Sequence, residues 1–145
     1  MKELKSCGIL LFDSADYERF LLLRHASRYD LPKGHIDRGE DELSCAFRET
    51  WEETGIESDQ ISLDDNFRCE IVYFPKYKRF CYEPVKKTLV MFLGHLTQDV
   101  DIDLTEHFSF EWVNWAPPHR IQEQSIDQVL AEVERYFSRR FPFTP

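Results

Sequence analysis

Apolar residues form short runs over the first third of the chain. Residues Cys7-Gly-Ile-Leu-Leu-Phe12 make a continuous apolar run, which is typical of a buried strand. Residues 13–16 supply a polar turn, and a second apolar run extends from Arg19 to His25, so we expect the two segments to pair as a hairpin. A short extended segment, 29–34, then opens into a loop that runs to Glu40.

The period of the apolar positions changes at Asp41. From there, apolar or small residues recur at spacings of three and four, which predicts one face of a helix. That face consists of Leu43, Ala46, Phe47, Thr50, Trp51 and Thr54. Gly55 is placed to end the helix as its C-cap.

Three further strands and a second helix are predicted in the rest of the chain. Phe67 to Phe74 and Val85 to Leu96 have strand character, and Phe110 to Trp115 forms a shorter strand. Ser125 to Phe137 returns to a helical period. The order of strands, helix, strands and helix, without repeat or linker, predicts one α+β domain over residues 1–145, with helices packed on a mixed sheet.

Composition and charge restrict the class of protein. With 42% hydrophobic and 31% charged residues, the chain is expected to be a soluble globule. Its apolar runs are far shorter than the roughly 20 residues that cross a bilayer, and its first residues lack the features of a secretory signal, so we expect a cytoplasmic protein. The net charge of −9 argues against binding to duplex nucleic acid or to an anionic membrane.

Acidic residues are concentrated in the first predicted helix. Glu49, Glu52 and Glu53 share one face, which we expect to lie opposite the apolar stripe. Like charges at these spacings repel, so a divalent cation would stabilise the arrangement. Oxygen ligands favour Mg²⁺, Mn²⁺ or Ca²⁺ over zinc or copper, and Mg²⁺ commonly shares its coordination with substrate phosphates. The alternative is a solvated acidic helix face without a ligand.

The residues around these glutamates favour the metal site. Gly34 and Gly39 bracket a tight loop whose backbone can approach a ligand, and Arg48 can brace the carboxylate of Glu40 from the adjacent helical turn. The whole segment from Gly34 to Ile56 resembles the signature of the Nudix hydrolases, G-x5-E-x7-R-E-U-x-E-E-x-G-U, in which U is a bulky apolar residue. Thr50 in place of the first U is the one departure.

This resemblance implies the Nudix fold, a mixed sheet sandwiched between helices (α/β/α). It implies hydrolysis of a phosphoanhydride bond in a substrate that contains a nucleoside diphosphate, with Mg²⁺, or Mn²⁺ in its place, as the cofactor. Glu49, Glu52 and Glu53 would bind the metal beside Gly34, and Glu52 or Glu53 would activate water. Glu40 and Arg48 belong to the same predicted catalytic set.

A second set of segments extends over most of the chain: Cys7-Gly-Ile-Leu-Leu-Phe12, Phe20-Leu-Leu-Leu23, Pro32-Lys-Gly-His35, Gly39-Glu-Asp41, Lys87-Thr88, Glu106-His107 and Trp112. In this order they resemble the animal-type asymmetrical diadenosine tetraphosphate hydrolases. The resemblance implies that Lys33 and Lys87 contact phosphates and that Tyr73 stacks on adenine. His35 and His107 would also bind substrate, and Glu106 would add a carboxylate to the metal site or act as a base.

Each of these residues also has a structural interpretation. Tyr73 can be a core residue, His35 a loop histidine bonded to backbone, and Glu106-His107 an ordinary surface turn. A cluster of basic and aromatic residues can bind a substrate whose phosphate chain ends in a base. The alternative is that the cluster only keeps the tip of a hairpin soluble. That cluster consists of Lys76, Tyr77, Lys78, Arg79, Phe80, Tyr82, Lys86 and Lys87.

The Nudix signature specifies the chemistry and leaves the substrate open. The connection from Phe74 to Lys87 is longer than usual in the diadenosine tetraphosphate hydrolases. Several substrates therefore remain alternatives to the small nucleotide diadenosine tetraphosphate: capped or triphosphorylated RNA, ADP-ribose, nucleoside triphosphates and diphosphoinositol phosphates. A catalytically silent nucleotide-binding module would be expected to lose signature glutamates, and none is lost. An interaction protein that uses the tail Phe141-Pro142-Phe143 is the remaining alternative.

Overall fold

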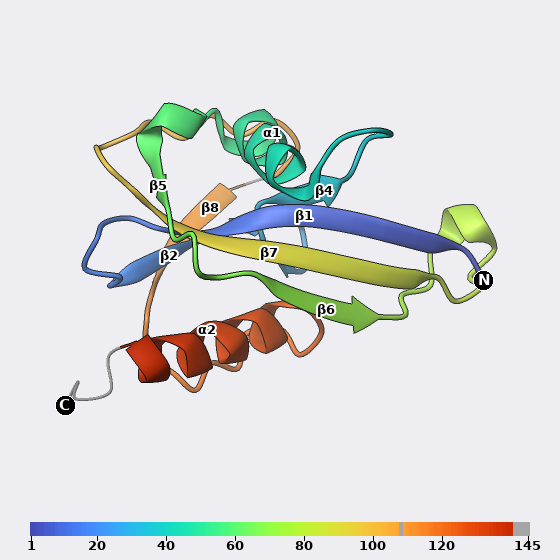
Figure 1. Ribbon diagram of the computed structural model, residues 1–145. Helices are drawn as coiled ribbons and strands as arrows, with labels where there is room; N and C mark the ends of the chain where they lie inside the picture. Colours follow the sequence, from blue (N-terminus) through green and yellow to red (C-terminus); the bar gives the residue numbers. More distant parts are fainter. Residues whose placement is uncertain (108, 141–145) are drawn as a thin grey trace.

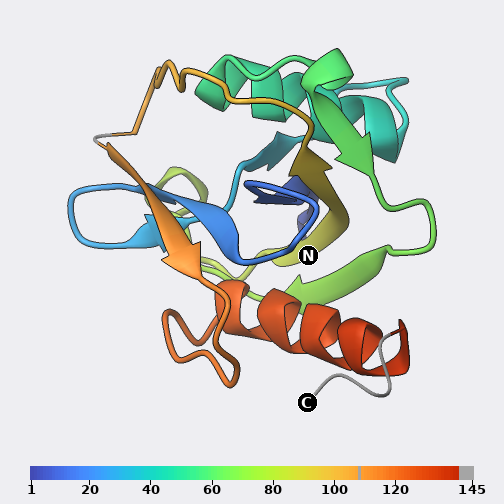
Figure 2. The same ribbon diagram turned by 90° about the vertical axis from the view of Figure 1, so that its left-hand side faces the viewer.

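Strands from both halves of the chain build one mixed sheet, with a helix on each face (Figures 1 and 2). The computed structural model describes residues 1–107 and 109–140. The strands of this part are β1 (Glu3–Phe12), β2 (Arg19–Arg24), β3 (Tyr29–Asp30), β4 (Lys33–His35), β5 (Ile61–Leu63), β6 (Cys69–Tyr73), β7 (Lys86–Leu96) and β8 (Ser109–Asn114), and the helices are α1 (Glu42–Thr54) and α2 (Ile126–Arg140). The predicted sandwich of helices around a mixed sheet is confirmed.

The parallel pair β1 and β7 forms the centre of the sheet, in register from Glu3 opposite Lys86 to Phe12 opposite His95. The edge of β1 that faces away from β7 pairs with two strands, β4 near the middle of β1 and β2 near its C-terminal end. The pairing of β1 with β2 confirms the predicted hairpin. The far edge of β7 pairs with β6 and β5. Because helices cover both faces, each central strand contains a continuous apolar run, residues 7–12 in β1 and 89–94 in β7.

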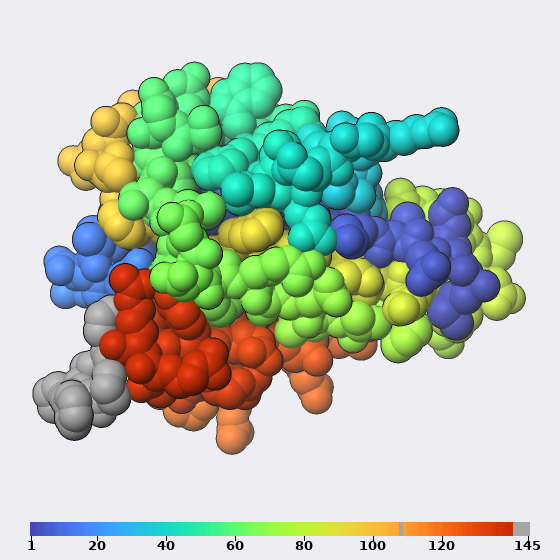
Figure 3. Space-filling model, in the orientation of Figure 1, coloured from blue at the N-terminus to red at the C-terminus, as the bar shows by residue number. Residues whose placement is uncertain are grey.

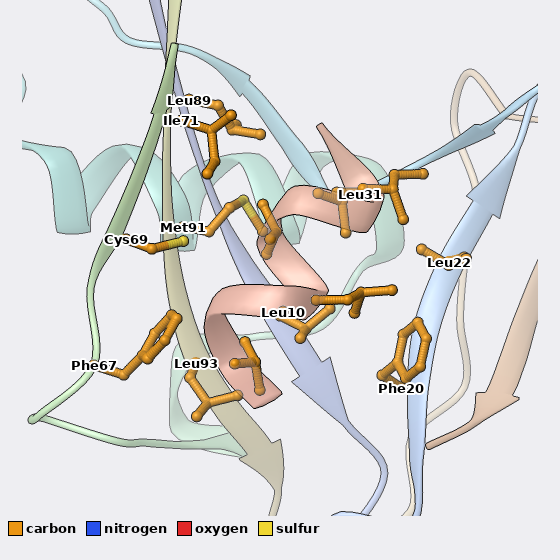
Figure 4. Close-up of a cluster of buried hydrophobic side chains, with 14 of the residues drawn as sticks. Leu10, Phe20, Leu22, Leu31, Phe67, Cys69, Ile71, Leu89, Met91 and Leu93 are labelled. Atoms are coloured by element: carbon orange, nitrogen blue, oxygen red, sulfur yellow. The ribbon is translucent and has the colours of Figure 1, made fainter. Parts of the chain in front are cut away.

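Two apolar cores lie on the two faces of the sheet. Alternate residues of β1 separate between them: Leu10 and Phe12 join the core beneath α2, and Ile9 and Leu11 join the core beneath α1. Figure 4 shows the first of these cores, in which side chains from β1, β2, β6 and β7 surround α2.

Helix α1 begins and ends where the sequence predicts. The Asp41 side chain accepts a hydrogen bond of 2.8 Å from the Ser44 N–H. Gly55 has a left-handed backbone (φ 77°), and its N–H donates to the Trp51 carbonyl. Both caps satisfy backbone groups that a helix end leaves unpaired.

The buried face of α1 differs from the predicted stripe. Trp51 is 54% exposed, whereas Cys45, which the stripe omits, is fully buried. Thr50 and Thr54 can face the sheet because their hydroxyls donate to carbonyls one turn earlier in the helix. The prediction that the glutamates lie opposite the buried face is therefore wrong: Glu49 and Glu53 are partly buried and border that face, beside β4.

The second half of the chain departs in detail from the prediction. Strand β6 is shorter than the predicted 67–74, because residues 64–67 form a turn before it. Strand β5 and the short 3₁₀ turns Ser58–Gln60 and Lys78–Phe80 were not predicted. Helix α2 continues to Arg140, and Phe141-Pro142-Phe143 lies outside the described residues. Neither helix in the described part has the length and apolar character to cross a membrane.

Candidate active site

Arg48 connects the carboxylates of the glutamate-rich segment. Its Nε lies 2.7 Å from Glu40 Oε2, and its Nη1 lies 2.8 Å from Glu49 Oε1 and 3.1 Å from Glu52 Oε2. Its Nη2 donates to the His35 carbonyl at 3.0 Å. Arg48, followed by the backbone N–H of Asp37, lowers the pKa of Glu40 to about 2. The predicted contact between Arg48 and Glu40 thus exists, and it ties the loop after β4 to α1.

Gly34 allows the Glu49 carboxylate to lie against strand β4. A Cβ atom at position 34 would overlap that carboxylate, so only glycine permits the approach. The Glu49 side chain is 13% exposed, and burial raises its pKa although Arg48 opposes the shift. A poorly solvated carboxylate next to backbone suits a hard cation, which oxygen ligands prefer.

Glu53 is the least compensated of the three glutamates. Its Oε2 accepts the Lys33 N–H at 3.1 Å. Burial, and after it the charge of Asp30, raises the pKa of Glu53 to about 8, while Lys33 opposes the shift. Glu52 is exposed at the outer side of the helix. Within the described part of the chain the three carboxylates do not all meet within 4.8 Å; Arg48 provides the positive charge next to Glu49 and Glu52.

The predicted substrate-binding residues of the sheet project from one face. In the register, Lys33 lies opposite Gly8 and His35 opposite Ser6 on β1, while Lys87 lies opposite Leu4. Because side chains alternate along a strand, all three project from the face that α2 covers, and Tyr73 joins them as the partner of Lys87 on β6. Strand β4 therefore separates the α1 carboxylates from the lysine side chains.

The two lysines have different partners. Lys33 Nζ lies 3.0 Å from Asp30 Oδ1. Burial lowers the pKa of Lys33, but Asp30, Tyr73 and Glu53 together raise it above its ordinary value. Lys87 is 5% exposed and has no carboxylate partner among residues 1–107 and 109–140. Burial and then the nearby charge of Lys33 lower the pKa of Lys87 to about 8. A buried amine in this position is stabilised by an anionic ligand.

The connection of residues 75–84 reaches these amines. Lys87 Nζ donates to the Tyr77 hydroxyl at 3.3 Å, and Arg79 Nη2 lies 3.5 Å from His35 Nε2. The Arg79 guanidinium also lies 5.0 Å from the centre of the Tyr77 ring. Figure 3 shows the connection (yellow-green) beside the N-terminal end of β1 (blue). The connection thus contacts Lys87 and His35 through Tyr77 and Arg79.

Comparison with known proteins decides the family. A model of the NUDIX domain matches residues 2–137. The chain belongs to the Nudix family. It is 35% identical to the asymmetrical bis(5'-nucleosyl)-tetraphosphatase of Mus musculus over 123 residues, which cover 76% of this chain and 78% of that relative.

Two further proteins are similar to this Nudix hydrolase, one in structure and one in sequence. The crystal structure of a C. elegans Ap4A hydrolase binary complex superposes with a TM-score of 0.77 at 25% identity, covering 94% of this chain and 98% of that one. The RNA pyrophosphohydrolase of Bartonella tribocorum is 28% identical over 130 residues, covering 76% of this chain and 75% of the relative. Nudix enzymes generally use a divalent metal, and the oxygen-only set on α1 fits one.

The remaining predicted site residues of the Nudix hydrolase lie in three different surroundings. Tyr73 is half-buried and packs against the core beneath α2. Glu106 is exposed on a loop that Thr105 holds to α1 by donating to the Glu52 carbonyl at 3.0 Å. His107 is buried, with Nε2 3.3 Å from Asp30 Oδ2, so it lies behind the partner of Lys33.

Sequence patterns did not single out Asp30 as part of this site, and Tyr77 was noted only as a member of the basic and aromatic cluster. Each contacts a lysine: Asp30 pairs with Lys33, and Tyr77 binds Lys87. Asp30 lies three residues before Lys33 in the extended segment, and this short spacing is the sequence signal that could have identified it. The contact between Asp30 and His107 joins residues 77 positions apart and has no local signal.

Proposed function

We propose that this Nudix hydrolase cleaves diadenosine tetraphosphate into ATP and AMP by Mg²⁺-dependent attack of water. The observation that carries the proposal is the buried amine of Lys87, which lacks a carboxylate partner in the described structure and lies near Lys33, Tyr73 and Tyr77. Paired amines suit a chain of phosphates, and neighbouring aromatic rings suit the base at its end. The relatives named as asymmetrical tetraphosphatases support this substrate.

In this proposal, different residues bind the phosphates, the base and the metal. Lys33 and Lys87 hold the phosphates, and Tyr73 stacks on one adenine, so the distance from that base determines which phosphorus is attacked. Glu49, Glu52 and Glu53, beside Gly34, would hold a divalent cation, which would supply neutralisation of phosphate charge and activation of water.

Glu53 receives the proton of the attacking water in this proposal, because its carboxylate is the least compensated of the three. Arg48 and Glu40 keep the loop after β4 against α1. Glu106 adds a carboxylate from the neighbouring loop that Thr105 anchors.

The products give the first test. Diadenosine tetraphosphate should split unequally into ATP and AMP, because the anchored base directs water to one phosphorus. Hydrolysis in ¹⁸O-labelled water, followed by mass spectrometry, should place the label in AMP. Two ADP molecules as products, or no turnover of this substrate beside rapid turnover of another nucleotide, would refute the proposed substrate while leaving the Nudix assignment intact.

Replacement of Tyr73 gives the second test. Tyr73→Ala should weaken substrate binding by about 1–3 kcal/mol, the value of one aromatic stack on a base. Metal affinity should not change. Phe74→Ala is the matched control, because Phe74 is the next residue, lies just after β6 and is 54% exposed. Tyr73→Phe keeps the ring and should bind as the parent does; equal losses in Tyr73→Ala and Phe74→Ala would remove Tyr73 from the binding site.

A 5′-triphosphorylated RNA is the second candidate substrate. The similarity to bacterial RNA pyrophosphohydrolases favours it, as does the basic and aromatic connection over Lys87. The two substrates are separated by measuring kcat/KM for each under the same metal conditions. A higher value for the RNA would make this second activity the principal one.

A further inference from the structure

Three side chains that commonly bind transition metals meet where β2, β3 and the segment before β8 come together. His25 follows β2, Asp30 belongs to β3, and His107 precedes β8. One ligand atom from each lies within 4.8 Å of the other two, and no other such trio of His, Cys, Asp or Glu occurs in the described part of the chain. The rings of His25 and His107 have centroids 4.3 Å apart.

His107 carries a nitrogen that nothing in the described structure satisfies. Its side chain is 2% exposed, and its Nδ1 is buried without a hydrogen-bond partner among residues 1–107 and 109–140. A buried polar atom left unpaired costs about 1–3 kcal/mol. Its Nε2 lies 3.3 Å from Asp30 Oδ2, a separation at which both atoms can bind one ion, and the ring hydrogen is then on Nδ1.

The two oxygens of Asp30 face different partners. Oδ1 lies 3.0 Å from Lys33 Nζ, and Oδ2 lies 3.3 Å from His107 Nε2. One oxygen is therefore directed at the histidines while the other stays with the lysine. Burial, then His107 and Arg28, lower the pKa of His25, while Asp30 and Glu106 oppose the shift.

We propose that His25, Asp30 and His107 form a second metal site, which binds a borderline transition-metal ion such as Zn²⁺. Two imidazoles and one carboxylate select such an ion over Mg²⁺, which prefers oxygen ligands alone. The set is that of a three-ligand zinc site with a fourth position for water. The site is separate from the oxygen-only set on α1, so it does not depend on the proposed hydrolytic function.

Cobalt is the probe for this site, because Co²⁺ replaces Zn²⁺ in such ligand sets and gives visible absorption bands whose intensity reports low coordination numbers. Tag-free protein is stripped of metal, saturated with Mg²⁺ and titrated with Co²⁺. We expect one equivalent of Co²⁺ to bind with intense visible bands, and one equivalent of Zn²⁺ to abolish them. Absence of these bands in Mg²⁺-saturated protein would overturn the proposal.

Variants locate the bound ion. His25→Gln should remove the bands while leaving the circular dichroism spectrum unchanged, because His25 is only half-buried and its side chain makes no hydrogen bond within the described residues. His107→Gln should do the same if it folds. His95→Gln, at a half-buried histidine on β7, is the matched control and should keep the bands. Glu53→Gln should also keep them; their loss in Glu53→Gln, or their persistence in His25→Gln, would show that the ion binds elsewhere.

Discussion

The Glu53→Gln variant should hydrolyse its nucleotide substrate about 10²–10⁴-fold more slowly than the parent, the range for a positioned catalytic group. Glutamine keeps the length of the side chain and its helical propensity, so the loss reports the missing charge. Steady-state kinetics at saturating substrate and Mg²⁺ measure the effect. Glu18→Gln, at an exposed glutamate on the turn before β2, is the control and should retain full activity.

The same variant should fold at least as well as the parent when metal is absent. The folded state raises the pKa of Glu53 to about 8, so the charged carboxylate opposes folding increasingly as the pH rises from the normal pKa of the group toward that value. Neutral glutamine removes this penalty, and its melting temperature at pH 7 should match or exceed that of the parent. A change in rate of less than a few-fold at an unchanged melting temperature would place the catalytic group elsewhere.

Removal of divalent metal should abolish hydrolysis. Glu49 and Glu53 are poorly solvated carboxylates with raised pKa values, and the ligands that the α1 glutamates offer are oxygen atoms alone, so Mg²⁺ or Mn²⁺ should restore activity after exhaustive treatment with EDTA. Turnover before treatment, after treatment and after addition of each metal gives the measurement.

Binding of the metal also has a readout that does not depend on turnover. Mg²⁺ should raise the melting temperature of the parent, because an ion that binds only the folded state stabilises it. The increase should be smaller in Glu53→Gln. Full activity in EDTA-treated protein would contradict the metal model, whatever the melting temperatures show.

Local signals allowed α1 and its carboxylates to be predicted from the sequence. The change of period at Asp41 and the C-cap at Gly55 each depend on residues within one or two helical turns, and the structure has the helix between them. The link between Arg48 and Glu40 spans eight residues across the helix start, and the spacing of the charges indicated it.

Contacts between distant segments could not be predicted in the same way. The period of α1 indicated an apolar stripe but not which flank of that stripe meets the sheet, because this depends on how closely β4 approaches at Gly34. Strand β5 has only three residues and is recognisable as a strand only through its pairing with β7. The contact of Asp30 with His107 depends on how β3 is aligned with the segment before β8.

The register of β1 has a consequence for the evolution of this fold. Lys33 and Lys87 are aligned with Gly8 and Leu4 of the same central strand, so their separation is inherited with the sheet. Tyr77 and Arg79 belong instead to the 75–84 connection, which joins two strands at one end of the sheet. Because this connection lies outside strands β6 and β7, its length or sequence can change in evolution without altering the separation of Lys33 and Lys87.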